Sequence, residues 1–130
     1  MFIEQPPWFY RALFPGVTWR IPAEKKCVYL TFDDGPTPGI TEWILSTLDK
    51  YDAKATFFVL GKNVEMYPDL YRRILDAGHR IGNHTYSHQK GWGMSLERYT
   101  EDVDFANDLI HSELFRPPYA QITPAQARFL

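Results

Sequence analysis

Two short polar clusters in this sequence combine residue types that bind metal ions and activate water. The first is the pair Asp33 and Asp34, which ends an apolar run and opens the sequence Asp-Asp-Gly-Pro. The second is His84 and His88, which are separated by three residues. One aspartate and two histidines form a ligand set that suits Zn²⁺ or a similar divalent ion and leaves a position for water. The other aspartate would be free to act as a base, so the pattern predicts a hydrolase site.

Each cluster also has an ordinary structural interpretation. Asp-Asp-Gly-Pro is a favourable turn sequence, and taken alone this interpretation is preferred. Neighbouring carboxylates repel each other, however, and a cation that neutralises one of them relieves the repulsion. His-x-x-x-His occurs by chance, and the nearby Gly82, Gly91 and Gly93 favour a loop over a mid-helix pair. We expect no chemical role for the other two histidines, since His79 should pack near the start of the third strand and His111 lies on the third predicted helix.

A third cluster is Arg116-Pro117-Pro118-Tyr119. The prolines restrict the backbone and can hold the N–H of Tyr119 in one direction. A fixed N–H donor that faces a developing oxyanion is worth on the order of 10²–10³ in rate. Arg116 can hold a carboxylate through a two-pronged contact. By itself, this cluster would be interpreted as a proline-rich loop with a surface arginine.

Hydrophobic periodicity predicts alternating strands and helices around these clusters. Strands are expected at residues 27–32, 55–60, 80–83 and 114–115. Helices are expected at about 40–51, 65–77 and 95–110, with another beginning at 124. The first strand reads as covered on both faces, and the first helix as packing through Ile40, Trp43, Ile44, Thr47, Leu48 and Tyr51. Gly78 is expected to end the second helix, and Ser95 to cap the third.

This order is typical of parallel βα units, whose functional residues lie at the carboxyl ends of the strands. Each of the three polar clusters follows a predicted strand. We therefore expect the clusters to meet on one face of the fold and to form a single site.

Length and composition limit the classes of protein to which this chain can belong. A chain of 130 residues with 45% hydrophobic and 23% charged residues is typical of one soluble globular domain. A formal net charge of −2 gives no indication of a nucleic-acid or anionic-membrane partner. The single cysteine, Cys27, excludes an intrachain disulfide and is expected to be buried as a small apolar residue. No apolar stretch approaches the roughly 20 residues of a membrane span.

Residues 1–24 are rich in proline and aromatic residues. We expect them to pack across the domain that follows, with a short helix near Trp8 to Leu13; an aromatic ligand-binding arm is the alternative. The first residues lack the basic start and apolar core of a signal peptide. This favours a cytoplasmic location. If a leader has been removed, the location would instead be outside the cytoplasm.

Taken together, the clusters resemble the motifs of the polysaccharide deacetylases, the NodB-homology group that forms carbohydrate esterase family four. Residues 31–36, 84–88 and 116–119 are similar to its first, second and third motifs. The resemblance covers most of residues 25–120, including the segments 55–58 and 78–84. It implies an α/β fold in which residues 25–130 form the N-terminal half of a distorted (β/α)7 barrel, with about four parallel βα units.

The resemblance also implies a reaction and a role for each residue. The family hydrolyses acetyl groups from N-acetylated sugars such as chitin oligomers and peptidoglycan, and in some members from O-acetylated xylan. Asp33 would be the base, Arg116 would orient it, and the N–H of Tyr119 would stabilise the oxyanion. Asp34, His84 and His88 are the implied metal ligands. The implied metal is Zn²⁺ in preference to Co²⁺, Ni²⁺ or Fe²⁺.

The chain departs from the family pattern in two places. Ala120 stands where the family commonly has glycine, which is expected to alter the loop. Later family motifs contain an Asp-Trp element and a Leu-x-His element whose histidine is the general acid. Only eleven residues follow Tyr119, and none is histidine.

Four βα units would leave open strand edges, which favour pairing with another copy. We therefore expect either a shortened chain or one that buries its fourth strand by self-association. The competing function is a catalytically incomplete fragment that binds metal or glycan, with Trp43 and Trp92 as candidate sugar-stacking residues. A more remote reading is a purely structural α/β domain, which would bind no zinc.

Overall fold

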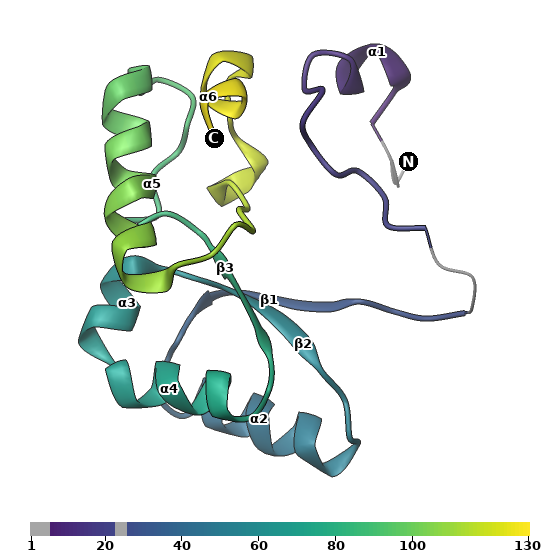
Figure 1. The fold of residues 1–130 in the computed structure, drawn as a ribbon, viewed down its shortest axis with the longest axis vertical. Helices are drawn as coiled ribbons and strands as arrows, with labels where there is room; N and C mark the ends of the chain where they lie inside the picture. The colour runs from purple at the N-terminus through teal and green to yellow at the C-terminus, as the bar shows by residue number, and fades with distance from the viewer. Residues whose placement is uncertain (1–5, 23–25) are drawn as a thin grey trace.

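The structure, a computed structural model, describes residues 6–22 and 26–130 and has the expected α/β architecture (Figure 1). Three parallel strands form one sheet in the order β1-β2-β3. The strands are β1 (Leu30–Gly35), β2 (Ala55–Val59) and β3 (Arg80–Asn83). The helices are α1 (Trp8–Arg11), α2 (Ile40–Lys50), α3 (Gly61–Met66), α4 (Pro68–Asp76), α5 (Leu96–Ile110), the short 3₁₀ helix η1 (Pro118–Ala120) and α6 (Pro124–Phe129).

The register of the sheet divides its side chains between a core face and a site face. Successive residues of a strand point to opposite faces, so residues aligned across the strands share a face. One aligned row packs against the helices and consists of Phe32, Phe57 and Ile81. The next row lies on the opposite face and consists of Asp33, Phe58 and Gly82. The same alignment thus buries one row and presents a carboxylate on the other.

The hydrophobic core lies between the sheet and the helices. It includes Leu45 and Leu48 of α2, Ile74 of α4 and Ala106 of α5, which pack together with β2. Figure 1 shows α2 and α4 side by side below the sheet, and α6 beside α5. This packing fixes the position of the sheet relative to the helices.

Two predicted helix boundaries are confirmed by their local chemistry. The Ser95 hydroxyl accepts a hydrogen bond from the backbone N–H of Arg98 and caps α5. Gly78, which follows the C-cap residue Ala77 of α4, has a φ of 74°, a conformation that glycine adopts without the steric cost of a Cβ. The buried residues Tyr99, Val103, Ala106 and Ile110 recur along α5 every three or four residues, which is the spacing of one helix face.

The expected helix at 65–77 is instead two helices. Tyr67 separates α3 from α4, and α4 begins at Pro68, whose ring nitrogen has no hydrogen to donate to a preceding turn. The inward face predicted for the first helix is also largely wrong: Ile40, Trp43 and Tyr51 are mostly exposed. The buried residues of α2 are Thr41, Leu45 and Leu48. Apolar residues occur around most of this helix, so their spacing did not select one face.

The prediction of a first strand at 27–32, covered on both faces, is wrong in extent and in burial. The strand begins at Leu30, and Cys27, expected to be buried, is exposed. Val28 and Tyr29 are 83% and 58% exposed. The apolar run favours extended backbone, but β1 is an edge strand that pairs only with β2 among the described residues.

The predicted fourth strand is reduced to one parallel bridge between Asn83 and Phe115. Pro117 and Pro118 follow directly and cannot donate ladder hydrogen bonds, which limits the length of the pairing. The bridge still brings residue 116 to the same edge of the sheet as the ends of β1 and β3.

In the described part of the N-terminal segment, residues 6–22, the rings of Tyr10, Phe14 and Trp19 pack against one another. Phe14 is buried, whereas Trp8 and Phe9 are exposed. That residues 1–24 form a unit packed across the domain stays a prediction, since residues 1–5, 23 and 24 lie outside the described residues.

The close approach of α3 and α5 depends on Gly61. A Cβ at this position would lie 2.6 Å from Cδ2 of Tyr86 and 3.0 Å from Cα of Ala106. We expect Gly61→Ala to lower the free energy of unfolding by about 1–3 kcal/mol, because backbone cannot move aside as a flexible side chain can. Urea denaturation measures this change. The control is Gly16→Ala, which has no neighbouring atom within 4 Å; equal effects of the two substitutions would contradict the prediction.

Candidate metal centre and active site

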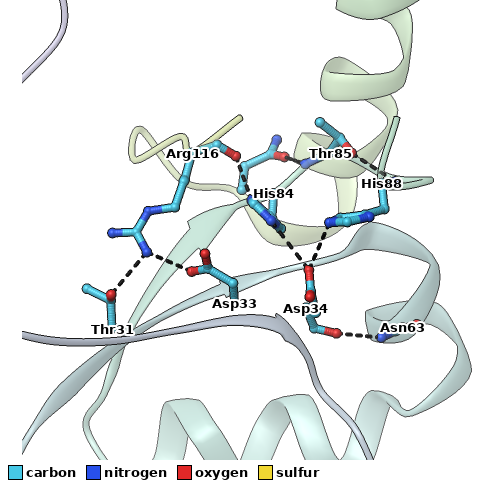
Figure 2. Close-up of polar contacts among 9 residues, drawn as sticks. Thr31, Asp33, Asp34, Asn63, His84, Thr85, His88 and Arg116 are labelled. Atoms are coloured by element: carbon cyan, nitrogen blue, oxygen red, sulfur yellow. Dashed lines mark hydrogen bonds and ion pairs between the residues drawn. The ribbon is translucent and has the colours of Figure 1, made fainter. Parts of the chain in front are cut away.

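The three polar clusters meet at the carboxyl edge of the sheet, as expected (Figure 2). Asp33 and Asp34 lie at the end of β1, the two histidines follow β3, and Arg116 follows the Phe115 bridge. The histidine pair lies in a loop, as its flanking glycines predicted.

A bulge in β1 directs the two neighbouring aspartates to different partners in the same site. Asp33 pairs with Phe58 and Gly35 with Val59, so Asp34 is an extra residue in the ladder. Its φ is 70°, and its carbonyl accepts a hydrogen bond of 2.8 Å from Nδ2 of Asn63. In a regular strand the two carboxylates would point to opposite faces, and the bulge removes this restriction.

The Asp34 carboxylate faces both histidines. Its Oδ1 lies 3.4 Å from Nε2 of His84 and 3.0 Å from Nε2 of His88. One ligand atom from each residue can be chosen so that all three lie within 4.8 Å of one another. Figure 2 shows the two imidazoles converging on this oxygen.

The tautomer of His84 is determined by its other nitrogen. Nδ1 lies 2.6 Å from the carbonyl oxygen of Arg116, and because a carbonyl can only accept, Nδ1 carries the hydrogen. The neutral ring therefore presents the lone pair of Nε2 to Asp34. Burial lowers the pKa of the His84 imidazole, and the carbonyl hydrogen bond and the nearby aspartates oppose this shift only in part. His84 is thus held in the form that binds a metal.

This donor set fits a divalent cation. A carboxylate oxygen and an imidazole lone pair are both electron donors, and at 3.4 Å they repel unless a cation or proton lies between them. One carboxylate and two imidazoles are the ligands that Zn²⁺ and similar ions bind.

Asp33 has a separate set of contacts. Its Oδ1 lies 2.7 Å from Nη1 of Arg116, and the same nitrogen donates to the Thr31 hydroxyl at 3.0 Å. The Arg116 guanidinium lies 4.0 Å from the centre of the Phe58 ring. The two-pronged contact that we expected between Arg116 and a carboxylate is not seen: Nη1 alone donates to the carboxylate and to the hydroxyl, because Thr31 and Asp33 share one face of β1.

Tyr119 and Ala120 both have left-handed backbone conformations, with φ values of 56° and 53°. The Tyr119 ring packs against that of His88, with 4.7 Å between their centres. Pro118 is buried. The third motif therefore contacts the second through side chains as well as through the carbonyl of Arg116.

A cavity of about 1160 Å³ opens onto this site. Its lining includes Asp33, Asp34, His84, His88, Arg116 and Tyr119, together with Tyr10, Phe14 and Trp19 of the N-terminal segment. Trp43 and Trp92, the candidate stacking residues, do not line it.

The expected packing role of His79 agrees with its position. It is buried directly before β3, and its Nδ1 accepts a hydrogen bond from the backbone N–H of Ala55. Burial, and to a lesser extent the charge of Lys54, lowers the pKa of this imidazole. His111 is the residue that ends α5. Neither lies at the carboxyl edge of the strands.

Sequence reasoning missed the residues that support the site. Asn83 accepts from the backbone N–H of Thr85 and donates to the Val103 carbonyl of α5. The Thr85 hydroxyl accepts from the backbone N–H of His88. Asp102 contacts the same loop from α5. Asn83 and Thr85 adjoin His84 and could have been suspected from this proximity, whereas the spacing of Asp102 gives no such signal.

Comparison with known proteins agrees with this geometry. The sequence model described as polysaccharide deacetylase matches residues 20–128. The chain belongs to the polysaccharide deacetylase family. Among curated family members, a peptidoglycan-N-acetylglucosamine deacetylase of Bacillus cereus is 40% identical over 114 residues, covering 84% of this chain and 54% of the relative. A chitooligosaccharide deacetylase of Rhizobium leguminosarum bv. trifolii is 40% identical over 90 residues, covering 69% and 42%.

Solved structures of polysaccharide deacetylases share the fold. The peptidoglycan deacetylase PdaC from Bacillus subtilis matches with a TM-score of 0.78 and 37% identity, covering 83% of this chain and 56% of that structure. The chain thus spans about half the length of the relatives named here and corresponds to half of the family's (β/α)7 barrel. The fold expected from the three motifs is confirmed.

The alanine at position 120 has a measurable cost. Its φ of 53° lies in the region where a Cβ is unfavourable and glycine is preferred, which agrees with the glycine that the family resemblance led us to expect here. We expect Ala120→Gly to raise the free energy of unfolding by about 1 kcal/mol. Ala127→Gly, inside α6, should lower it by a similar amount, about 1 kcal/mol. Urea denaturation of both variants checks the opposite signs; two destabilised variants would contradict the strain at Ala120.

Proposed function

We propose that this chain carries the metal-binding and base half of an active site that hydrolyses acetyl groups from a carbohydrate polymer or oligosaccharide. The observation that carries the proposal is that two neighbouring carboxylates have different partners. Asp34 faces two imidazole nitrogens, while Asp33, one residue away, is held by Arg116 instead. The reaction is hydrolysis of a carbon–nitrogen, non-peptide bond of an N-acetyl group, in preference to an O-acetyl ester.

Asp34, His84 and His88 would hold the metal ion. We propose Zn²⁺, with Co²⁺, Ni²⁺ and Fe²⁺ as alternatives, since all of them accept imidazole and carboxylate ligands. When bound, such an ion supplies Lewis acidity, which polarises a carbonyl and lowers the pKa of water. The Nδ1 hydrogen bond of His84 to a backbone carbonyl is the kind of contact that orients a ligand and increases its basicity.

Asp33 would accept the proton of the attacking water. Its side chain is 37% exposed and lines the cavity, so it can reach a water molecule there. The hydrogen bond from Arg116 keeps it directed at the site. The backbone N–H of Tyr119 would donate to the oxyanion that develops on the acetyl group.

The substrate would occupy the cavity that opens onto these groups. The relatives described above are named for N-acetylglucosamine in peptidoglycan and for chitooligosaccharide. Both are polymers or oligomers of N-acetylated sugars, and a cavity of about 1160 Å³ slightly exceeds the roughly 300–1,000 Å³ of ordinary small-molecule sites. We therefore propose an N-acetylated glycan as the substrate class.

The alternative is a unit that binds metal or glycan without turning it over. Of the four histidines in the sequence, two face Asp34, and the others, His79 and His111, lie away from the site. The chain by itself thus offers no histidine to protonate the departing amine. Loss of a general acid typically costs about 10²–10⁴ in rate, and the loss is larger for poorer leaving groups.

A comparison of two acetyl substrates separates these possibilities. With Zn²⁺ added, we expect the chain to hydrolyse an aryl acetate, whose leaving group needs no proton, faster than N-acetylglucosamine oligomers. Asp33→Asn should abolish both activities and keep metal affinity, whereas Asp34→Asn should weaken metal binding itself. Acetate release and calorimetric titration with Zn²⁺ are the measurements.

The matched control is Asp49→Asn, an exposed aspartate on α2, which should change neither quantity. Metal binding without hydrolysis of either substrate would favour the non-catalytic alternative. No metal binding by the unsubstituted chain would contradict the proposed function.

We also propose that the open edge of β1 pairs with a second copy of the chain. The exposed residues beside this edge include Val28 and Tyr29, and the strand pairs on one side only among the described residues. Val28→Lys should reduce self-association, since a charged residue disfavours edge pairing. Val17→Lys, outside the sheet, is the control. A monomer at all concentrations in size-exclusion chromatography would overturn this proposal.

Within residues 6–22 and 26–130, no helix has the length and apolar character needed to cross a membrane. The cellular location expected from the N-terminus stays a prediction.

A further inference from the structure

We propose that Asp102 is the positioning residue of the metal site, holding the loop between His84 and His88 in the shape that binds the ion. This inference rests on the metal site of the proposed function. Asp102 belongs to α5 and is not one of the three candidate ligands. It would therefore act through the loop rather than on the metal.

The Asp102 carboxylate uses both oxygens on two adjacent loop residues. Its Oδ2 accepts the backbone N–H groups of Tyr86 and Ser87, each at 3.1 Å. Its Oδ1 accepts the Ser87 hydroxyl at 2.6 Å. Three donors on one carboxylate fix both the position and the rotation of the segment.

These contacts lie at the centre of the His-x-x-x-His segment. Tyr86 and Ser87 are the two residues directly before His88, and the preceding Thr85 has a φ of 67°. His88 itself has a φ of 61°. Two left-handed residues in so short a loop are unfavourable by themselves, so the loop needs external contacts to keep this conformation.

The helix that carries Asp102 is a rigid support. Its neighbours Tyr99, Val103 and Ala106 are buried, and the Val103 carbonyl accepts a hydrogen bond from Asn83 next to His84. One turn of α5 therefore holds the loop at both ends, through Asn83 before His84 and through Asp102 before His88. Without Asp102, His88 would sample other positions. Metal binding would then have to order His88, and the metal affinity would be lower.

Asp102→Ala removes both carboxylate oxygens and with them three hydrogen bonds to the loop, and leaves the 3.2 Å bond from the Tyr86 N–H to the Asp102 backbone carbonyl. It should weaken Zn²⁺ binding about 10–100-fold, the usual effect of removing a group that orients a metal ligand. Asp104→Ala is the matched control: the same substitution on the same helix, at an exposed residue that makes no hydrogen bond to the loop. Its affinity should equal that of the unsubstituted chain.

Asp102→Asn is the conservative variant. Its amide carbonyl can accept both backbone N–H groups, and its NH₂ can donate to Ser87 Oγ, which then acts as acceptor. We expect Asp102→Asn to retain most of the metal affinity. If Asp102→Ala does not fold, Ser87→Ala, which removes the hydroxyl contact alone, should still weaken binding by a smaller factor.

Amide hydrogen exchange of the metal-free protein tests the positioning independently of the metal. The amides of Tyr86, Ser87 and His88 should exchange faster in Asp102→Ala than in Asp104→Ala, while those of β2 stay protected. The inference would be overturned if Asp102→Ala left the exchange of these amides unchanged. It would also be overturned if Asp102→Ala sped their exchange but left the Zn²⁺ affinity unchanged. A third outcome is that Asp102→Ala speeds exchange but the unsubstituted protein itself binds no metal. That result would support the contact between Asp102 and the loop, but it would overturn the role of Asp102 in metal binding and contradict the proposed function.

Discussion

The extra residue in β1 is the constraint on which the site depends. Two adjacent strand residues ordinarily point to opposite faces, so a regular strand would bury one of the aspartates or turn it away from the cavity. The bulge at Asp34 allows both carboxylates to reach the same site while Asp33 keeps its alignment with Phe58. The conformation of Asp34 is unfavourable for a residue with a Cβ, and the hydrogen bond from Asn63 to its carbonyl helps to offset that cost.

Arg116 connects the two halves of the site. Its side chain lies over Phe58 and bonds to Asp33, its carbonyl orients His84, and its backbone N–H bonds to the carbonyl of Asn83. One residue thus positions the candidate base and one candidate metal ligand. Because these contacts use both backbone and side chain, a small displacement of the loop would move the candidate base and the candidate metal ligand together.

The loops of the site are held from outside by helices that follow them in sequence. Asp102 of α5 holds the loop before His88. The buried Gln126 of α6 donates to the carbonyls of Gly91 and Met94, beyond His88. The segment that follows β3 therefore depends on contacts with elements that come later in the chain. The open edge of β1 is the opposite case, since among the described residues no second strand pairs with it, and Val28, Tyr29 and Leu30 are exposed.

Local sequence determined much of this protein. Apolar runs placed the strands, Ser95 and Gly78 marked helix ends, and the spacing of three motifs indicated the family, its fold and the six candidate site residues, because these features depend on near neighbours in the chain. Tertiary structure decided the rest. Whether Cys27 and Trp43 are buried depends on which surfaces pack against them, and neither the bulge at Asp34 nor the reach of Asp102 to the histidine loop has a local signature. Exposure and positioning arise from contacts between residues distant in sequence, which periodicity does not encode.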